Sequence, residues 1–304
     1  MEVMNSPKVK KPLGSRIAFA IAFAILVIYS AFLLFFIIFG FVLGLKPSGV
    51  AITESLRGNY LFSISKDSKI SNFIDSIIYW SEYTKTDVVS VSYFESFFNS
   101  VWKTFLGTFI NWFCTTLVCY VLVHYRSKFT RGIYLLGLFL SMIPLYGAGA
   151  AEYRLFSAEG LNIMNSPFIY LSNITLFGGN FFYMYAFWKS IQWEYAEAAE
   201  IDGCSQWKIF FKIMLPMVIP SSIALFVMLF ISNWNNYEYT ALYMDKFPDL
   251  AYGIYIFDAN SDYNGGFTHL YFASVLLSFA PIVILFVCFQ NTIMEKVYLG
   301  GLKG

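Results

Sequence analysis

A run of amides and aromatic rings near residue 235 is the part of the sequence best suited to bind a small molecule. It contains Asn233, Trp234, Asn235, Asn236, Tyr237, Glu238 and Tyr239. Amides and carboxylates hydrogen-bond to hydroxyl groups, and Tyr and Trp combine an apolar ring with a polar edge. The mixture predicts contact with a hydroxylated solute such as a sugar. An aromatic belt with polar helix ends at a membrane surface has the same composition, so both interpretations stay open.

A second candidate for a solute path is Asn180, which follows two glycines inside an apolar run. Lipid offers an amide no hydrogen-bond partner, so we expect this side chain to face other helices. It contacts either a solute or a neighbouring helix, and the sequence leaves that choice open.

Patterns that would indicate catalysis are missing from the sequence. The two histidines, His124 and His269, are expected on opposite sides of a membrane and so cannot share a metal. The chain has no GxxxxGK[ST] phosphate loop and suggests no Ser-His-Asp or Cys-His arrangement. We therefore expect a non-catalytic chain that binds no metal and no cofactor of its own.

Residues 194–220 predict a helix, a turn and a second helix. Ala196, Ala198 and Ala199 favour helix and lack bulk, so a partner surface can come close. Gly203 suits the left-handed position just past a helix end, and Ser205 can cap the helix that follows. A short exposed helix with acidic residues predicts a docking element, and an amphipathic connector on the membrane surface is the alternative.

The elements that hold these residues must lie mostly in lipid. The 304 residues are 58% hydrophobic, 21% aromatic and only 13% charged, and the net charge is +1. A span needs about 20 apolar residues, and six charge-free runs are long enough. They cover residues 17–45, 104–123, 132–151, 160–188, 213–237 and 263–294. The sequence predicts an all-α integral membrane protein with six transmembrane helices.

The distribution of Lys and Arg predicts the orientation. They are frequent in the segments that would be cytoplasmic with the N-terminus inside, whereas the two short outer loops contain only Arg154 and Lys246. The predicted organisation is a cytoplasmic N-terminus (1–16), a first transmembrane helix (17–45), an extracytoplasmic segment (46–103), a five-helix core (104–294) with the loop 190–212 inside, and a cytoplasmic tail (295–304). A short surface helix is expected after Ser71.

The segment around residue 200 resembles a known family. Glu197-Ala198-Ala199-x-x-Asp202-Gly203, followed by Leu215-Pro216 and Pro220, is similar to the EAA loop of bacterial ABC importer permeases. The form Ile201-Asp202-Gly203 resembles the branch that imports sugars and oligosaccharides. Over residues 99–304 the sequence resembles the maltose-importer type of second permease subunit, a type I permease fold with six helices in the bacterial plasma membrane.

This resemblance implies partners. They are a second permease subunit that forms a heterodimer with this chain, two cytoplasmic ATPase subunits that bind ATP and Mg, and an extracytoplasmic solute-binding protein. The family's subunit is not itself an enzyme. The ATPase subunits hydrolyse ATP, and the EAA helices convert their motion into alternating access of the transmembrane pair.

The resemblance also assigns roles to residues of this sequence. The coupling helix would be formed by Glu197, Ala198, Ala199, Asp202 and Gly203. The tail that reaches the ATPase interface would be Gly300, Gly301, Leu302, Lys303 and Gly304. The substrate path, which is predicted from the residues themselves, comprises Asn180, Asn233, Trp234, Asn236 and Tyr237, whereas the resemblance implies that the other permease subunit holds most of the sugar. The last outer loop, with Tyr252, Gly253, Tyr255 and Asn260, would contact the binding protein.

The sequence departs from the family pattern at two places. Cys204 replaces a usual Ala, and the first outer segment is longer than usual. Two other functions are weighed against a sugar importer. An importer of a peptide or amino acid would keep the EAA loop but would usually lack both Ile201-Asp202-Gly203 and the Trp-Asn stretch Asn233-Trp234-Asn235. A secondary transporter or a membrane scaffold would need no EAA loop.

Overall fold

The computed structural model describes residues 13–58, 62–64, 66–86, 88–125, 127–143, 149–172, 174, 177–264 and 267–300, and every regular element in these ranges is a helix. The chain divides into two compact units. The first comprises Met1–Ser76 and Asn264–Leu276, and the second comprises Ile77–Tyr263 and Leu277–Gly304.

The first unit contains α1 (Leu13–Gly44), α2 (Ser48–Leu56), most of α3 (Ser71–Ile78) and the beginning of α14 (Thr268–Gly300). The side-chain amide of Asn72 closes the end of α1, because it donates to the carbonyl oxygens of Gly44 at 2.8 Å and Lys46 at 2.9 Å. These carbonyls have no partner within the helix. The ammonium of Lys46 is also buried against the carboxylate of Glu54, at 2.5 Å. The short helix expected after Ser71 is confirmed as α3, and its buried side chains are the polar Asn72 and Ser76.

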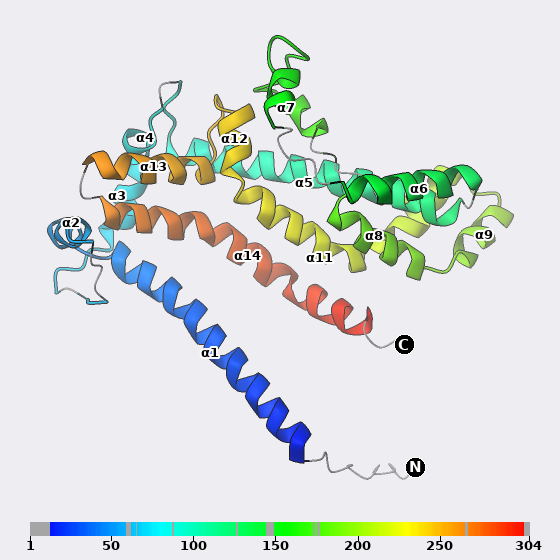
Figure 1. Ribbon diagram of the computed structural model, residues 1–304, viewed down its shortest axis with the longest axis horizontal. Coiled ribbons are helices and arrows are strands. Elements are labelled where there is room, and N and C mark those ends of the chain that lie inside the picture. Colours follow the sequence, from blue (N-terminus) through cyan, green and yellow to red (C-terminus); the bar gives the residue numbers. More distant parts are fainter. Residues whose placement is uncertain are drawn as a thin grey trace. The chain divides into compact units, whose positions relative to one another are not determined.

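The second unit contains the remaining helices (Figure 1). They are α4 (Trp80–Tyr83), α5 (Tyr93–His124), α6 (Lys128–Ser141), α7 (Gly149–Phe156), the 3₁₀ helix η1 (Pro167–Leu171), α8 (Gly179–Ser190), α9 (Glu194–Ile201), α10 (Gln206–Ile209), the π-helix η2 (Phe210–Met214), α11 (Leu215–Trp234), α12 (Tyr237–Tyr243), α13 (Leu250–Asn264) and the rest of α14. The long helix α5 packs against α8 and α11, and its two ends meet different elements. The predicted coupling segment lies at the His124 end, and α12 lies nearer the Tyr93 end.

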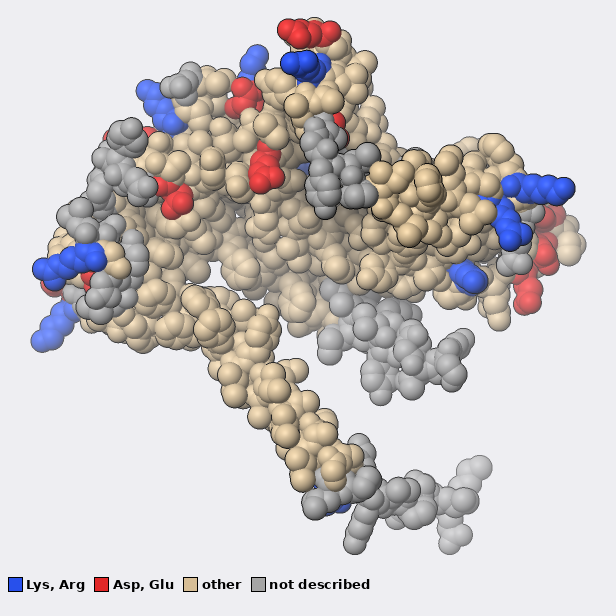
Figure 2. Space-filling view, in the orientation of Figure 1, with Lys and Arg blue, Asp and Glu red and all other residues tan. Residues whose placement is uncertain are grey.

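Among the residues that the structure describes, four stretches of helix are long and apolar enough to cross a membrane. They are Gly14–Gly44, Tyr93–His124, Gln206–Trp234 and Thr268–Asn291, and they coincide with the first, second, fifth and sixth charge-free runs. The chain is therefore a helical, multi-pass membrane protein. In this view charged side chains lie along the upper side of the second unit and at its right end, and the rest of the visible surface is largely uncharged (Figure 2).

The other two runs are divided, which corrects the expectation of one continuous helix in each. In the run 132–151, α6 ends at Ser141 and α7 begins at Gly149. In the run 160–188, α8 begins only at Gly179, after a 3₁₀ helix that starts at Pro167. The absence of charge predicts an apolar environment but not a helix, and proline lacks the N–H that an α-helix interior requires. The six-span topology stays a prediction.

The second run also begins earlier than expected. Helix α5 starts at Tyr93 rather than near residue 104, because Ser92 has extended backbone angles and its hydroxyl accepts a hydrogen bond from the N–H of Glu95 at 3.3 Å. The end of the predicted extracytoplasmic segment 46–103 is thus the first third of this helix. Lys103, expected as the last residue before a span, instead lies within helix α5.

Candidate functional site

The turn that follows α9 has the geometry of a helix C-terminus closed by glycine. Gly203 has φ +75°, its N–H donates to the carbonyl of Glu200 at 2.9 Å, and the N–H of Cys204 donates to that of Ala199 at 2.9 Å. This pair of bonds is the Schellman motif, which satisfies carbonyls left free at a helix end. The predicted left-handed glycine is confirmed. Ser205 occupies the cap position of α10 with extended backbone, although its side chain forms no capping hydrogen bond.

Side-chain hydrogen bonds attach the turn to the end of α5. The amide of Gln206 donates to a carboxylate oxygen of Glu200 at 2.5 Å and accepts from the hydroxyl of Tyr125 at 2.6 Å. Beside them, the rings of His124 and Trp193 stack with centroids 4.5 Å apart. Helices α9 and α10 are therefore held at one end of α5.

The predicted coupling residues divide between the two sides of α9. Ala199 is buried, together with Ala196, in a core formed by side chains of α5, α8 and η2. Glu197, Ala198 and Asp202 are exposed instead. Of the three alanines from which a small docking face was predicted, Ala196 and Ala199 pack inward, and only Ala198 is available to a partner.

Large apolar side chains stand exposed next to these residues. Ile201 is 86% exposed and Trp207 is 70% exposed. Together with Glu197, Ala198 and Asp202 they form an acidic surface with apolar side chains, which we call the α9 surface. Acidic side chains gather at this end of the second unit in Figure 2. Exposed apolar residues rimmed by polar ones are typical of an interaction site.

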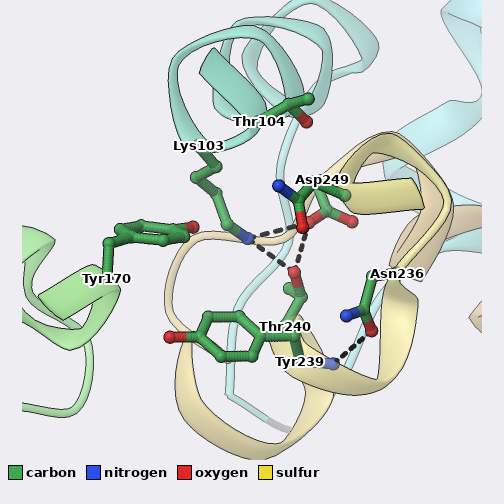
Figure 3. Close-up of a pocket in the computed structure, with 8 residues that line it drawn as sticks. Lys103, Thr104, Tyr170, Asn236, Tyr239, Thr240 and Asp249 are labelled. Carbon is green, nitrogen blue, oxygen red and sulfur yellow. Dashed lines mark hydrogen bonds and ion pairs between the residues drawn. The ribbon is translucent and has the colours of Figure 1, made fainter. Parts of the chain in front are cut away.

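A buried ion pair lies toward the other end of α5 (Figure 3). The ammonium of Lys103 donates to the carboxylate of Asp249 at 2.8 Å, to the hydroxyl of Thr240 at 2.7 Å and to the carbonyl of Phe247 at 3.0 Å. The Thr240 hydroxyl donates to the same carboxylate oxygen, and the other oxygen accepts from the N–H of Tyr252 at 2.9 Å. All three ammonium protons and both carboxylate oxygens thus have partners, as burial of opposite charges requires.

A small cavity adjoins this ion pair. Its volume is about 20 Å³, which is room for one water molecule rather than a sugar ring. Asn233 and Asn236, two residues of the predicted substrate path, line it with Tyr170 and Tyr239. Burial raises the pKa of Tyr239 to about 12, so its hydroxyl stays protonated and donates to the carbonyl of Ile169 at 3.0 Å.

The residues of the predicted substrate path differ in their hydrogen-bond partners and burial. Trp234 is buried, and its indole N–H donates to the carbonyl of Ser278 at 3.2 Å, so it holds α11 against α14. The Asn233 amide donates to the hydroxyl of Thr108 at 3.0 Å. Asn236 caps α12 by accepting from the N–H of Tyr239. Asn180 lies half-buried in the first turn of α8. Asn233 and Asn236 therefore share the small cavity, whereas Asn180 and Trp234 do not line it.

The last outer loop is largely the helix α13. Three tyrosine rings form a stack there: Tyr237 and Tyr255 have centroids 4.6 Å apart at 14°, and Tyr252 lies 6.4 Å from Tyr255 at 16°. Tyr255 is 46% exposed. The stack joins one residue of the predicted substrate path to two of the predicted binding-protein contact.

Gly253 and Asn260 of the same helix have packing positions. Gly253 is buried, and a Cβ on it would lie 2.3 Å from the indole of Trp80. The amide of Asn260 donates to the carbonyl of Tyr83 at 3.1 Å. Both residues attach α13 to α4. In the predicted tail, Gly300 is the last residue of α14, and Gly301, Leu302, Lys303 and Gly304 lie outside the described residues.

Sequence reasoning missed the Lys103–Asp249 pair. The two residues are 146 positions apart, and each had been assigned to an outer segment for its charge alone. The one available signal was the position of Lys103 directly before an apolar run, where a cation must find a partner if the helix continues.

The family described as "Binding-protein-dependent transport system inner membrane component" matches residues 8–297. The chain is 28% identical over 295 residues to the arabinooligosaccharides transport system permease protein of Bacillus subtilis (strain 168), covering 95% of this chain and 96% of that protein. It is 23% identical over 252 residues to the lactose transport system permease protein of Rhizobium radiobacter, covering 83% and 84%.

A solved structure has a similar fold. It is a chain of a bacterial ABC transporter involved in the import of the acidic polysaccharide alginate. The TM-score is 0.68 with 20% sequence identity, and the match covers 93% of this chain and 99% of that chain. At this identity the likeness concerns the fold alone.

Proposed function

Because the chain belongs to the family of binding-protein-dependent transport system inner membrane components, we propose that it is a permease subunit of an ATP-driven importer that translocates a sugar or oligosaccharide. The observation that carries this proposal is the match over residues 8–297 together with relatives named for arabinooligosaccharide, lactose and diacetylchitobiose transport. These names favour a sugar over a peptide or amino acid. A binding-protein-dependent family also argues against a secondary transporter.

In this proposal the α9 surface contacts an ATPase subunit and receives the movement that ATP hydrolysis produces. ATP and Mg bind to two cytoplasmic ATPase subunits, and Glu197, Ala198, Asp202 and Gly203 contact one of them. The exposed Ile201 and Trp207 side chains support such a contact, since burying them gains free energy. Ala199 contributes from inside by holding α9 to the core. The tail 300–304 extends toward the same ATPase dimer.

The topology that this role requires has six spans, with both termini and the loop 190–212 in the cytoplasm of a bacterium. Helices α6 and α8 belong to the third and fourth spans, although each is shorter than a bilayer-crossing helix. Non-helical backbone within a membrane is tolerated where protein covers it. A second permease that forms a heterodimer with this chain would provide that cover.

On the outer side, an extracytoplasmic binding protein delivers the solute. Tyr252 and Tyr255 contact it, and Tyr237 continues their stack toward Asn236 and Asn233. Aromatic faces beside amides suit sugar rings and hydroxyl groups. The cavity beside Lys103 holds about one water, so solute passage needs these residues to separate or the partner subunit to form the path.

Uptake in a reconstituted system tests the proposal. The chain is co-expressed with the second permease, ATPase and binding-protein genes that adjoin its own, and purified components are placed in proteoliposomes. We expect ATP-dependent uptake of a labelled oligosaccharide and none of a tripeptide or an amino acid. Uptake of the tripeptide or amino acid would assign a different solute. Uptake driven by an ion gradient without ATP would overturn the importer.

A further inference from the structure

A hollow of about 670 Å³ lies between α5, α6 and α8, and the transport role proposed above does not use it. Three cations line it: Lys128 and Arg131 from the first turn of α6, and Lys189 from the last turn of α8. All three side chains are exposed. No carboxylate is among the described residues that line the hollow, so its charge is positive and uncompensated.

The inner wall of the hollow is apolar. Leu122 and Val123, near the end of α5, are buried side chains that line it. Tyr134 and Tyr185 complete the wall with rings stacked at 4.9 Å and 27°. An apolar wall with cations at its margin, and Tyr rings between the two, matches the composition of the boundary between lipid tails and water.

The position of two of these cations favours an anion. Lys128 and Arg131 are in the first turn of α6, which contains no acidic residue. The N-terminal end of a helix is the positive end of its dipole, so cations are unfavourable there and anions are favourable. A phosphate between the two side chains would remove this repulsion. The N-terminus of α6 is stabilised by a capping box that Ser127 and Thr130 form.

We propose that this hollow binds the headgroup of an anionic phospholipid, with its phosphate against Arg131, Lys128 and Lys189 and an acyl chain along Leu122 and Val123. The location fits a lipid of the bilayer, because α5 is a candidate span that ends at His124 and the cations lie just beyond that end of the helix. Basic pockets between transmembrane helices at the cytoplasmic surface hold such headgroups. An anionic lipid there would fix the mutual position of α6 and α8.

The test measures binding of dioleoylphosphatidylglycerol to the purified full-length chain in detergent by native mass spectrometry, with dioleoylphosphatidylcholine in parallel. The wild type should bind phosphatidylglycerol more tightly than phosphatidylcholine. Each basic residue near an anionic lipid contributes about fivefold, so the double variant Arg131→Gln/Lys189→Gln should bind phosphatidylglycerol on the order of thirtyfold more weakly. Lys208→Gln/Lys212→Gln is the matched control, because both side chains are exposed and lie outside the hollow. It should bind as the wild type does.

The arms of the experiment separate the sources of a phosphate. Inorganic phosphate at the same concentration should not displace phosphatidylglycerol, because it lacks the acyl chain. Displacement by it would assign a soluble anion and overturn the lipid site. Equal binding of the two lipids, or an unchanged affinity of the Arg131→Gln/Lys189→Gln variant, would also overturn it. Loss of assembly with a partner subunit in that variant, with lipid binding unchanged, would assign the hollow to a protein.

Discussion

The ammonium of Lys103 lies 2.8 Å from the carboxylate of Asp249, and both groups are buried. Lys103 belongs to α5, and Asp249 directly precedes α13, so the ion pair attaches the start of α13 to a candidate membrane span. Thr240 of α12 bonds to both partners. In the function proposed above, a binding protein contacts α13, and we expect these bonds to transmit a movement of α13 to α5 and α12, whose residues line the cavity.

Removing one charge of this pair should destabilise the protein strongly. In Lys103→Met the carboxylate of Asp249 stays buried without its cation, and we expect a loss of about 3–5 kcal/mol in the free energy of unfolding. The double variant Lys103→Met/Asp249→Leu leaves no unpaired charge and should recover most of that loss. Thermal unfolding of the purified protein in detergent measures both.

Lys208→Met is the control for these variants, because it removes an exposed cation from α10, outside the proposed lipid site, and should change the stability by less than about 0.5 kcal/mol. A single variant Lys103→Met as stable as the control would mean that the pair contributes nothing. A double variant less stable than Lys103→Met would show that packing, rather than charge, dominates at this position.

Several parts of the fold follow from the sequence because local chemistry determines them. The left-handed Gly203 and the four long apolar helices are of this kind. The run 160–188 was expected to be one helix, but Pro167 and the backbone at Asn165, with φ 55°, interrupt a segment that composition alone describes as apolar. Helix α13 was read as a loop because its Gly, Asn and Asp residues disfavour helix, whereas packing of Phe257 and Gly253 against other elements stabilises it.

In the candidate sites too, contacts between residues close in the sequence can be predicted, and contacts between distant residues cannot. The α9 turn lies within a few residues, so spacing predicts it. The contact between Lys103 and Asp249, and the stack of Tyr237 on Tyr255, join residues far apart in the chain. A single sequence does not identify which two residues form such a pair. Burial of Trp234 also depends on α14, and from the sequence its ring was equally consistent with a solute path.

Replacement of a single tyrosine tests the outer contact better than removal of the segment 255–260. That deletion would also remove Phe257, which is 1% exposed, and the hydrogen bond from Asn260 to Tyr83, so it would disrupt α13 itself. Tyr255→Ala removes an exposed ring and should lower uptake about tenfold while the subunits still assemble. Uptake assays with the loaded binding protein measure the effect, and Asp258→Ala, an exposed change on the same helix, is the control.

If Tyr255→Ala transports like the wild type, the tyrosine stack has no part in transport. If it fails to assemble, the ring has a structural role instead. Tyr255→Phe keeps the stacking face and should retain most of the uptake, which separates ring stacking from hydroxyl hydrogen bonding.

The proposed orientation predicts which residues are reached from outside the cell. In a variant without native cysteines, a cysteine at Asp258 should react with a membrane-impermeant maleimide added to intact cells, and one at Glu200 should not. Both positions are exposed on the protein, so accessibility depends on the side of the membrane alone. Permeabilised cells, in which both should react, provide the control. Labelling at Glu200 in intact cells would reverse the orientation.

The coupling turn gives the sharpest prediction. A Cβ at Gly203 would meet no atom of this chain within 4 Å, so within the subunit a substitution there acts through the backbone angle of φ +75°. Valine at this angle costs about 1–2 kcal/mol, and the turn would relax into another conformation. Asparagine adopts the left-handed region more readily. Gly203→Val should therefore abolish binding-protein-stimulated ATP hydrolysis, and Gly203→Asn should retain most of it.

The same surface can be tested by charge without changing the backbone. Glu197 is exposed on α9, and Glu197→Lys places a cation where an acidic side chain meets the ATPase subunit in our proposal. We expect Glu197 to face a basic surface of the ATPase. The new lysine would repel that surface, so capture of the ATPase by the purified permease pair should fall at least tenfold. Glu159→Lys, an exposed change outside the α9 surface, should capture it normally. Wild-type capture and ATP turnover in both Gly203→Val and Glu197→Lys would show that the α9 turn is an ordinary connector and would remove the coupling role from the proposed function.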